Sequence, residues 1–211
     1  MADRPIIFAA PMIRALLSGR KTQTRRVVRD GPDGRWFVDA RHGGLDWVAP
    51  EGSPRLPIRL PYAPGDRLWV RETWLINDYR YERPIPKSRP DDLESDDVLY
   101  RATERDSEAQ TEGIWRGAIH MPRWASRLTL IVTDVRVQRL QEISAEDVAA
   151  EGACELAFAP PTDEDTQEAR ALLRDLWNSL HGPDAWDKNP WVVALSFDVH
   201  RGNIDQATGD E

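Results

Sequence analysis

The chain has 211 residues, with 28 lysines and arginines against 36 aspartates and glutamates, so its formal net charge is −8. This balance excludes a uniformly basic protein that coats nucleic acid, and a hydrophobic share of 40% excludes disorder throughout the chain. Its single cysteine, Cys154, excludes an internal disulfide and a cysteine-based zinc cluster, and no signal-like or membrane-spanning apolar run is seen, so we expect a cytoplasmic protein.

The N-terminal third of the sequence predicts a strand, a short helix and then loops. Residues 6–8 are an apolar run typical of a buried strand. Pro11 is suited to the first turn of a helix, and Gly19 is suited to end it. Residues 30–60 are rich in glycine and proline, which indicates loops or a hairpin with a strand over 35–38.

The middle of the sequence predicts two strands separated by a polar segment. Residues 67–74 alternate in the period of two that is typical of a strand. Residues 77–112 are acidic and interrupted by prolines, which favours a surface insertion with one strand over 97–102. Residues 127–140 alternate again and predict a long, bent strand, of the kind that helps to close a small barrel.

The C-terminal third predicts two helices, a strand and a tail. Ser144 is suited to cap a short helix, and Thr162 a longer amphipathic one. Residues 191–197 predict a buried strand, and 201–211 a flexible tail. The pattern indicates an α+β fold built on a small barrel, with one domain over 1–200 and insertions at about the two segments named above.

The negative total conceals two basic segments. Residues 1–29 hold seven basic residues and one acid, and residues 113–139 hold five basic residues and one acid. If the fold brings these segments together, they form a positive surface that attracts an anion. The alternative is that their arginines pair with nearby acids across a mixed surface.

Several motifs resemble a known family. Residues 19–26 (Gly-Arg-Lys-Thr-Gln-Thr-Arg-Arg) and 64–74 (Pro-Gly-Asp-Arg-Leu-Trp-Val-Arg-Glu-Thr-Trp), with the apolar pair 7–8, resemble the ASCH family of PUA-like domains. The blocks 120–127 and 189–192 resemble the branch found in phages and prophages, which implies a protein made in the bacterial host cell. The resemblance implies a PUA-like β-barrel with flanking helices and a cleft for RNA, DNA or a nucleoside.

The resemblance also implies a catalytic set. Small bacterial members of the superfamily hydrolyse N(4)-acetylcytidine with a lysine, a threonine and a downstream glutamate, which Lys21, Thr24 and Glu72 match by position. Thr24 would attack the amide or position water, Lys21 would act as a base once its pKa is lowered, and Glu72 would orient Lys21 or protonate the leaving amine. The alternative for Lys21 and Glu72 is a structural ion pair.

A second group of side chains is predicted to bind the ligand. Guanidiniums present paired donors to phosphate oxygens, and Trp74 shares a strand face with Glu72, where its ring could stack on a base. The alternative for the arginines is pairing with acids of the protein. The predicted binding residues are Arg20, Arg25, Arg26, Trp74, Arg123 and Arg127.

The predicted function is therefore directed at nucleic acid or a nucleoside. The partner is RNA, a single strand or a modified nucleoside, and the scattered histidines predict neither a metal nor another cofactor. Three alternatives to an amidohydrolase stay open: a binding module without catalysis, a metal-independent ribonuclease, and a phage accessory protein that binds a host protein through its acidic segments.

Overall fold

The structure is a computed structural model, and it describes most of the chain. The described residues are 2–28, 36–39, 44–47, 56–57, 60–81, 85–94, 97–104, 113–152 and 163–206. Cys154 and Thr162 lie outside these residues.

The chain divides into two compact units. The first unit comprises Met1–Gly19, Gly65–Ile131 and Asp198–Glu211. The second unit comprises Arg20–Pro64 and Val132–Phe197.

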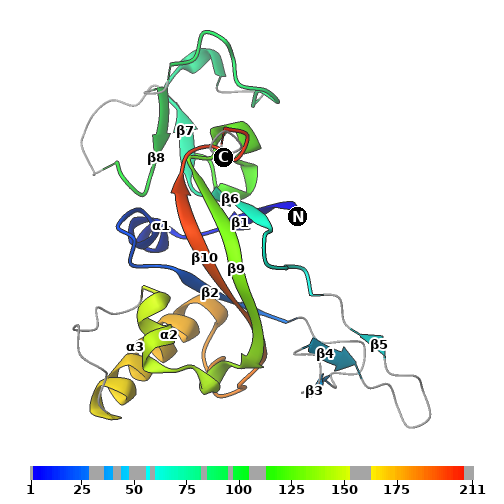
Figure 1. Ribbon diagram of the computed structural model, residues 1–211. Coiled ribbons are helices and arrows are strands. Elements are labelled where there is room, and N and C mark those ends of the chain that lie inside the picture. Colours follow the sequence, from blue (N-terminus) through cyan, green and yellow to red (C-terminus); the bar gives the residue numbers. More distant parts are fainter. Residues whose placement is uncertain are drawn as a thin grey trace. The chain divides into compact units, whose positions relative to one another are not determined.

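The main β structure is a mixed five-stranded sheet with the strand order β1-β6-β9-β10-β2 (Figure 1). Together with the helices it confirms the α+β class. Over the described residues no closed barrel is detected, so the predicted barrel stays a proposal. The strands are β1 (Asp3–Ile7), β6 (Arg67–Arg71), β9 (Leu128–Arg139), β10 (Trp191–Arg201) and β2 (Gln23–Val27).

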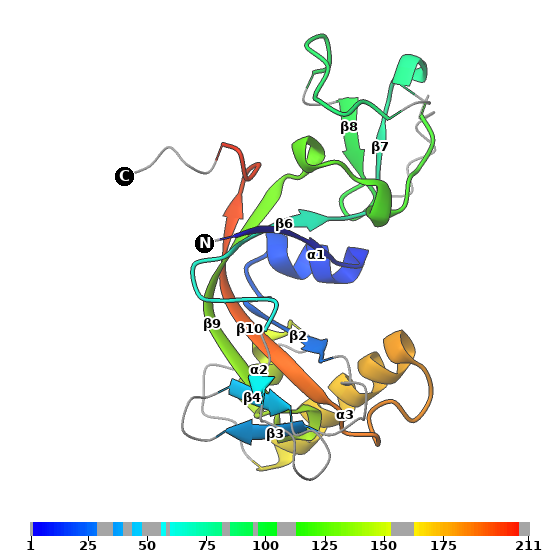
Figure 2. The same cartoon turned by 90° about the vertical axis from the view of Figure 1, so that its right-hand side faces the viewer.

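In the first unit, β1 pairs in parallel with β6, and β6 pairs antiparallel with β9. The alternation of β6 buries Leu68 and Val70, which are 0% and 1% exposed. Helix α1 (Ala10–Leu17) lies beside these strands (Figure 2) and buries Ile13 and Leu16. The predicted N-terminal strand and the short helix after it are thereby confirmed.

The predicted strand over 67–74 is interrupted at Glu72. Strand β6 ends one residue before it, and β7 (Trp74–Ile76) begins two residues after it and pairs with β8 (Val98–Tyr100) in a separate two-stranded sheet. The backbone N–H of Glu72 donates to Met121 Sδ at 3.2 Å. Because this donor is directed at a side chain, the ladder does not continue through Glu72.

The predicted surface insertion 77–112 contributes to the core of the first unit. Leu93 and Val98, which come from its described part, are each 5% exposed. The 3-10 helix η1 (Tyr79–Tyr81) lies within this segment, and two more follow it: η3 (Ala118–His120) and η4 (Arg123–Ala125). The apolar cluster contains Trp74, Ile76, Leu93, Val98, Met121 and Ala125.

The first residues of the predicted tail are packed against the first unit. Ile204 is completely buried, and residues 207–211 lie outside the described part. The side-chain amide of Asn203 donates at 2.8 to 3.1 Å to the carbonyl oxygens of Arg123, Trp124 and Ser126.

In the second unit, β2 pairs antiparallel with β10, with Thr24 opposite Leu195. The 3-10 helix η5 (Leu140–Glu142) leads to helix α2 (Ala145–Ala150), where the Ser144 hydroxyl accepts from the Asp147 backbone N–H as predicted. A further three-stranded sheet contains β3 (Trp36–Asp39), β4 (Gly44–Trp47) and β5 (Leu56–Pro57).

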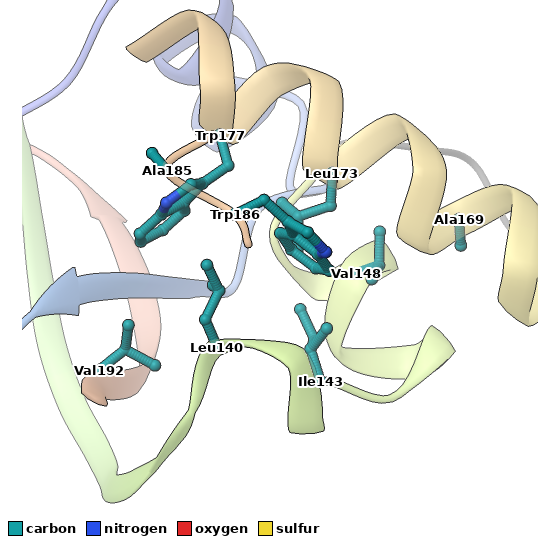
Figure 3. Packing of buried hydrophobic residues seen from close by; sticks show 9 residues of the cluster. All are labelled: Leu140, Ile143, Val148, Ala169, Leu173, Trp177, Ala185, Trp186 and Val192. Atoms are coloured by element: carbon teal, nitrogen blue, oxygen red, sulfur yellow. The ribbon is translucent and has the colours of Figure 1, made fainter. Parts of the chain in front are cut away.

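Helix α3 (Asp163–His181) confirms the longer predicted helix and packs one face on the core of the second unit. Ala169, Leu173 and Trp177 follow one another at intervals of four along that face (Figure 3). They meet Trp186 and Leu140 from other segments. None of the helices in the described ranges combines the length and apolar character that crossing a membrane requires.

Candidate functional site

The predicted lysine lies in a buried ion cluster of the second unit. Lys21 is 1% exposed, and its Nζ donates at 2.7 Å to the Glu151 carboxylate and at 2.9 Å to the Glu151 carbonyl. Burial lowers the pKa of Lys21, and the negative charge of Glu151 opposes this shift. The acid that holds Lys21 is thus Glu151, which the sequence motifs did not identify.

Arg25 belongs to the same cluster. Its Nη2 donates to Asp147 at 2.6 Å, and its Nη1 donates to Glu151 at 3.0 Å and to Gln23 at 2.6 Å. The Arg25 side chain is 1% exposed. Its Nη donors are directed at protein acceptors, which agrees with the alternative of pairing with acids, and its role as a phosphate contact stays a prediction.

The ion cluster forms because the spacing of two along a strand and the spacing of four along a helix each place charged side chains on one face. Lys21, Gln23 and Arg25 alternate along the chain so that their side chains share one face of the β2 segment. Asp147 and Glu151 are four residues apart at α2 and share one face of the helix. Arg25 contacts both acids, so the strand face meets the helix face as a row of opposite charges.

Asp147 is the acid of the cluster with the most arginine contacts. It accepts from Arg25 and, at 3.0 Å, from Arg136. Burial by itself would raise the pKa of Asp147, but hydrogen bonds from Arg136 and Gln23 and the charge of Arg25 lower it. This carboxylate is therefore charged at neutral pH.

Thr24 does not share the face of Lys21. Alternation along β2 places Thr24 opposite the face of Gln23 and Arg25, where it pairs with Leu195. The predicted convergence of Lys21 and Thr24 required a turn in this segment, and the structure has a strand there instead. Arg26 is half-buried, and Arg20 is exposed.

Glu72 has a different partner, in the first unit. Its carboxylate is 2% exposed and accepts from Arg127 Nε and Nη2, both at 2.9 Å. Burial raises the pKa of Glu72, whereas the hydrogen bonds from Arg127 lower it, and the net shift is upward. Lys21 and Glu72 thus belong to different units and are each paired with another residue.

The guanidinium of Arg127 lies over an aromatic ring. Its Cζ is 4.0 Å from the centroid of Tyr100, and its Nη1 donates to the Thr103 hydroxyl at 3.2 Å. Burial raises the pKa of Tyr100 to about 12, so the ring stays neutral beneath the cation. Glu72 and Thr103 thus accept three of the five N–H donors of Arg127.

Tyr100 and Arg127 line a cleft of about 730 Å³ in the first unit. Its lining includes the cations Arg89 and Arg127 and residues of the packed C-terminal segment. The lining includes Arg89, Tyr100, Trp124, Arg127, Asn203 and Asp205. Such a volume is typical of small-ligand sites, which range from about 300 to 1,000 Å³.

Trp74 and Arg123 were predicted to bind the ligand. In the structure both are engaged in contacts within the protein. Trp74 is completely buried, and its ring meets Trp124 edge-on at 5.9 Å. It is a core residue, so its ring offers no open face for a base. Arg123 pairs with Asp3 and Asp205, each at 2.6 Å, and these hydrogen bonds raise the pKa of Arg123.

Sequence reasoning missed Glu151, Asp147 and Tyr100. The acids had a usable signal, because they stand four apart at a predicted helix beside a basic strand. Tyr100 had none, since it lies in a segment that was predicted to be a surface insertion. Within the described residues, no three His, Cys, Asp or Glu side chains gather as a metal site requires.

Comparisons of the chain with protein-family models, curated proteins and solved structures found no match. The contacts within this chain are therefore the basis for assigning a function.

Proposed function

We propose that the chain binds a nucleoside, free or within a short single strand, in the cleft of the first unit, and that the base stacks on Arg127. The observation that carries this proposal is the Arg127 guanidinium, which donates from one edge to Glu72 and has its Cζ 4.0 Å from the Tyr100 ring centroid. A guanidinium plane is one of the surfaces on which unstacked bases are bound by proteins.

The donors of Arg127 make a stacking role more suitable than a phosphate contact. Three of its five N–H donors are used: Nε and Nη2 each donate to Glu72, and Nη1 donates to Thr103. The guanidinium carbon lies 4.0 Å from the Tyr100 ring centroid, and the side chain is 24% exposed and lines the cleft. The exposed part therefore offers a flat, charged surface, which suits the π-face of any base.

Polar groups around the cleft suit the remainder of a nucleoside. Asp205 supplies carboxylate oxygens that can accept from a ribose hydroxyl or an exocyclic amine. Arg89, whose Nη2 donates to the Leu93 carbonyl at 3.0 Å, adds a cation at the exposed part of the lining. The balance of charges favours a small ligand over a long polyanion.

The family resemblance agrees with this assignment. ASCH domains are PUA-like barrels with a cleft for RNA, DNA or a nucleoside, and we propose the same fold and ligand class here. The mixed sheet with its long strands β9 and β10 supports the fold proposal.

Calorimetric titration with cytidine and N(4)-acetylcytidine tests the binding proposal. Arg127→Lys keeps a cation beside Glu72 but removes the plane, and we expect it to weaken binding by about 1 to 3 kcal/mol. Arg174→Lys is the matched control, because Arg174 lies on α3 and its side chain is 50% exposed. Equal affinities for the wild type and Arg127→Lys would overturn the proposal.

Amide hydrolysis is the second candidate function. It rests on the family resemblance, because Lys21 pairs with Glu151 and Glu72 with Arg127 instead of with each other. In the reaction, water adds to the acetyl carbonyl, the C–N bond breaks, and the amine leaves with a proton to give cytidine and acetate.

Release of acetate from N(4)-acetylcytidine tests this candidate. Turnover by the wild type and its loss in Thr24→Val and Glu72→Gln, with folding checked by circular dichroism, is the supporting result. No acetate from the folded wild type excludes hydrolysis and leaves the binding proposal standing.

A further inference from the structure

A second concave site lies in the first unit, next to the cleft. It is a groove of about 810 Å³ between α1 and the turn at residues 101–104. The predicted catalytic and ligand-binding residues lie outside its lining. Its polar lining consists of Arg14, Ser18, Arg101, Thr103 and Glu104.

The groove has the donors that a phosphate group requires. Arg14 and Arg101 are exposed and supply these donors, whereas the hydroxyls of Ser18 and Thr103 donate to the Ala15 and Tyr100 carbonyls. Guanidiniums and hydroxyls are the side chains that most often contact phosphate oxygens in nucleic-acid complexes. Glu104 is the one carboxylate of this lining, and it opposes the two cations.

Contacts within the first unit fix this arrangement. Arg14 Nη1 donates to the Ala102 carbonyl at 3.3 Å, which ties α1 to the turn. The Arg101 guanidinium lies 5.3 Å from the centroid of Trp115. Both cations are thereby held near the groove instead of extending freely into water.

The groove and the cleft share a wall. Tyr100 lines the cleft, and the next four residues line the groove. Arg127, which lines the cleft, donates at 3.2 Å to the hydroxyl of Thr103, which lines the groove. A ligand that reaches past this hydrogen bond enters the second site from the first.

We infer that the groove binds the phosphate next to the base held in the cleft, so that the preferred ligand is a short phosphodiester single strand and not a free nucleoside. This inference rests on the proposed function, because it takes the base to occupy the cleft. Two cations against one carboxylate suit one or two phosphates.

Salt-dependent binding of a fluorescein-labelled oligouridine of about ten nucleotides, followed by anisotropy, tests the inference. Each of Arg14→Gln and Arg101→Gln should lower the log–log salt slope by about 0.7 and the affinity about fourfold at about 0.15 M salt. Glu104→Gln should act in the opposite direction and tighten binding. Cytidine affinity, measured by calorimetry, should not change in these variants.

Arg174→Gln, outside the first unit, is the charge-matched control. Phosphate binding in the groove would be contradicted by unchanged oligouridine salt slopes in Arg14→Gln and Arg101→Gln, or by an equal decrease in Arg174→Gln. Failure of the proposed function looks different, because cytidine would then not bind the wild type at all. The same measurements with an oligodeoxythymidine test whether the phosphodiester, which RNA and DNA share, is sufficient for binding in the groove. Equal salt slopes for the two oligonucleotides support this. If neither variant changes the binding of oligodeoxythymidine, the phosphodiester is not sufficient.

Discussion

At the scale of single residues, Glu72 acts by positioning Arg127. Its two carboxylate oxygens each accept from the guanidinium at 2.9 Å, and this leaves the plane of Arg127 over Tyr100. A bidentate pair fixes orientation as well as distance. Loss of charge on Glu72 should therefore affect the ligand surface, although Glu72 itself is buried.

We predict that nucleoside affinity decreases as the pH falls through the raised pKa of Glu72. Protonation removes one charge of the pair and frees the guanidinium to tilt. The decrease should begin above the ordinary glutamate value of 4.5, because burial raises this pKa. Calorimetry across this range measures it, and Glu72→Gln should flatten the profile.

The stability of the fold should respond with the opposite sign. Since the pKa of Glu72 is higher in the folded chain than in the unfolded chain, the folded form takes up the proton more readily. The contribution of this group to stability is full below its unfolded pKa and is lost as the pH rises through the folded pKa.

For ligand binding, a nucleoside affinity that stays constant down to pH 4.5 would contradict the positioning role of Glu72.

At the scale of elements, the β2 segment and α2 are joined by a buried row of charges. Lys21 and Arg25 on one side meet Asp147 and Glu151 on the other. Burying an ion pair costs desolvation energy, so the pair adds little to the stability of the fold. Removing one partner is destabilising, because it leaves the other charge buried and unpaired.

We predict that Glu151→Ala lowers the free energy of unfolding by about 3 to 5 kcal/mol. Lys21 is 1% exposed and would lose its carboxylate partner. Urea unfolding followed by circular dichroism measures the change. Glu168→Ala, on an exposed position of α3, should stay within about 0.5 kcal/mol of the wild type. A loss for Glu151→Ala no larger than this control would show that the cluster does not hold Lys21.

Local patterns were enough to predict most elements, and long-range contacts explain what they missed. Periodicity and capping residues predicted α1, α2, α3 and the long strands, because these signals lie within a few neighbouring residues. The interruption of the strand at Glu72 involves Met121, and the Glu72 carboxylate is held by Arg127, both of which are far along the chain. The partner of Lys21 is likewise 130 residues away.

At the scale of the whole molecule, several arginines of the two basic segments are paired with acids of the same chain. Arg25 pairs with Asp147 and Glu151, Arg123 with Asp3 and Asp205, and Arg127 with Glu72. This matches the alternative in which the arginines pair with acids. Charge counting could not separate the two cases, because it contains no information on which acid lies beside which arginine.

Ligand binding is therefore expected at a local site on an acidic protein. The cleft and the groove bring Arg14, Arg89, Arg101 and Arg127 to one unit, whereas the total charge is −8. Repulsion from the remaining surface disfavours long polyanions. We expect wild-type affinity for duplex DNA to stay below that for the ten-nucleotide single strand, as a competition assay would measure. Stronger binding to the duplex would contradict a localised site.

A crystal structure of the chain with bound cytidine or N(4)-acetylcytidine tests the central claim most directly. The account predicts a base in the cleft, parallel to the guanidinium of Arg127 on the face opposite Tyr100, with the Glu72 carboxylate still bound to Nε and Nη2. A nucleoside bound elsewhere, such as beside Lys21, or held by the edge of Arg127 after its separation from Glu72, would contradict it.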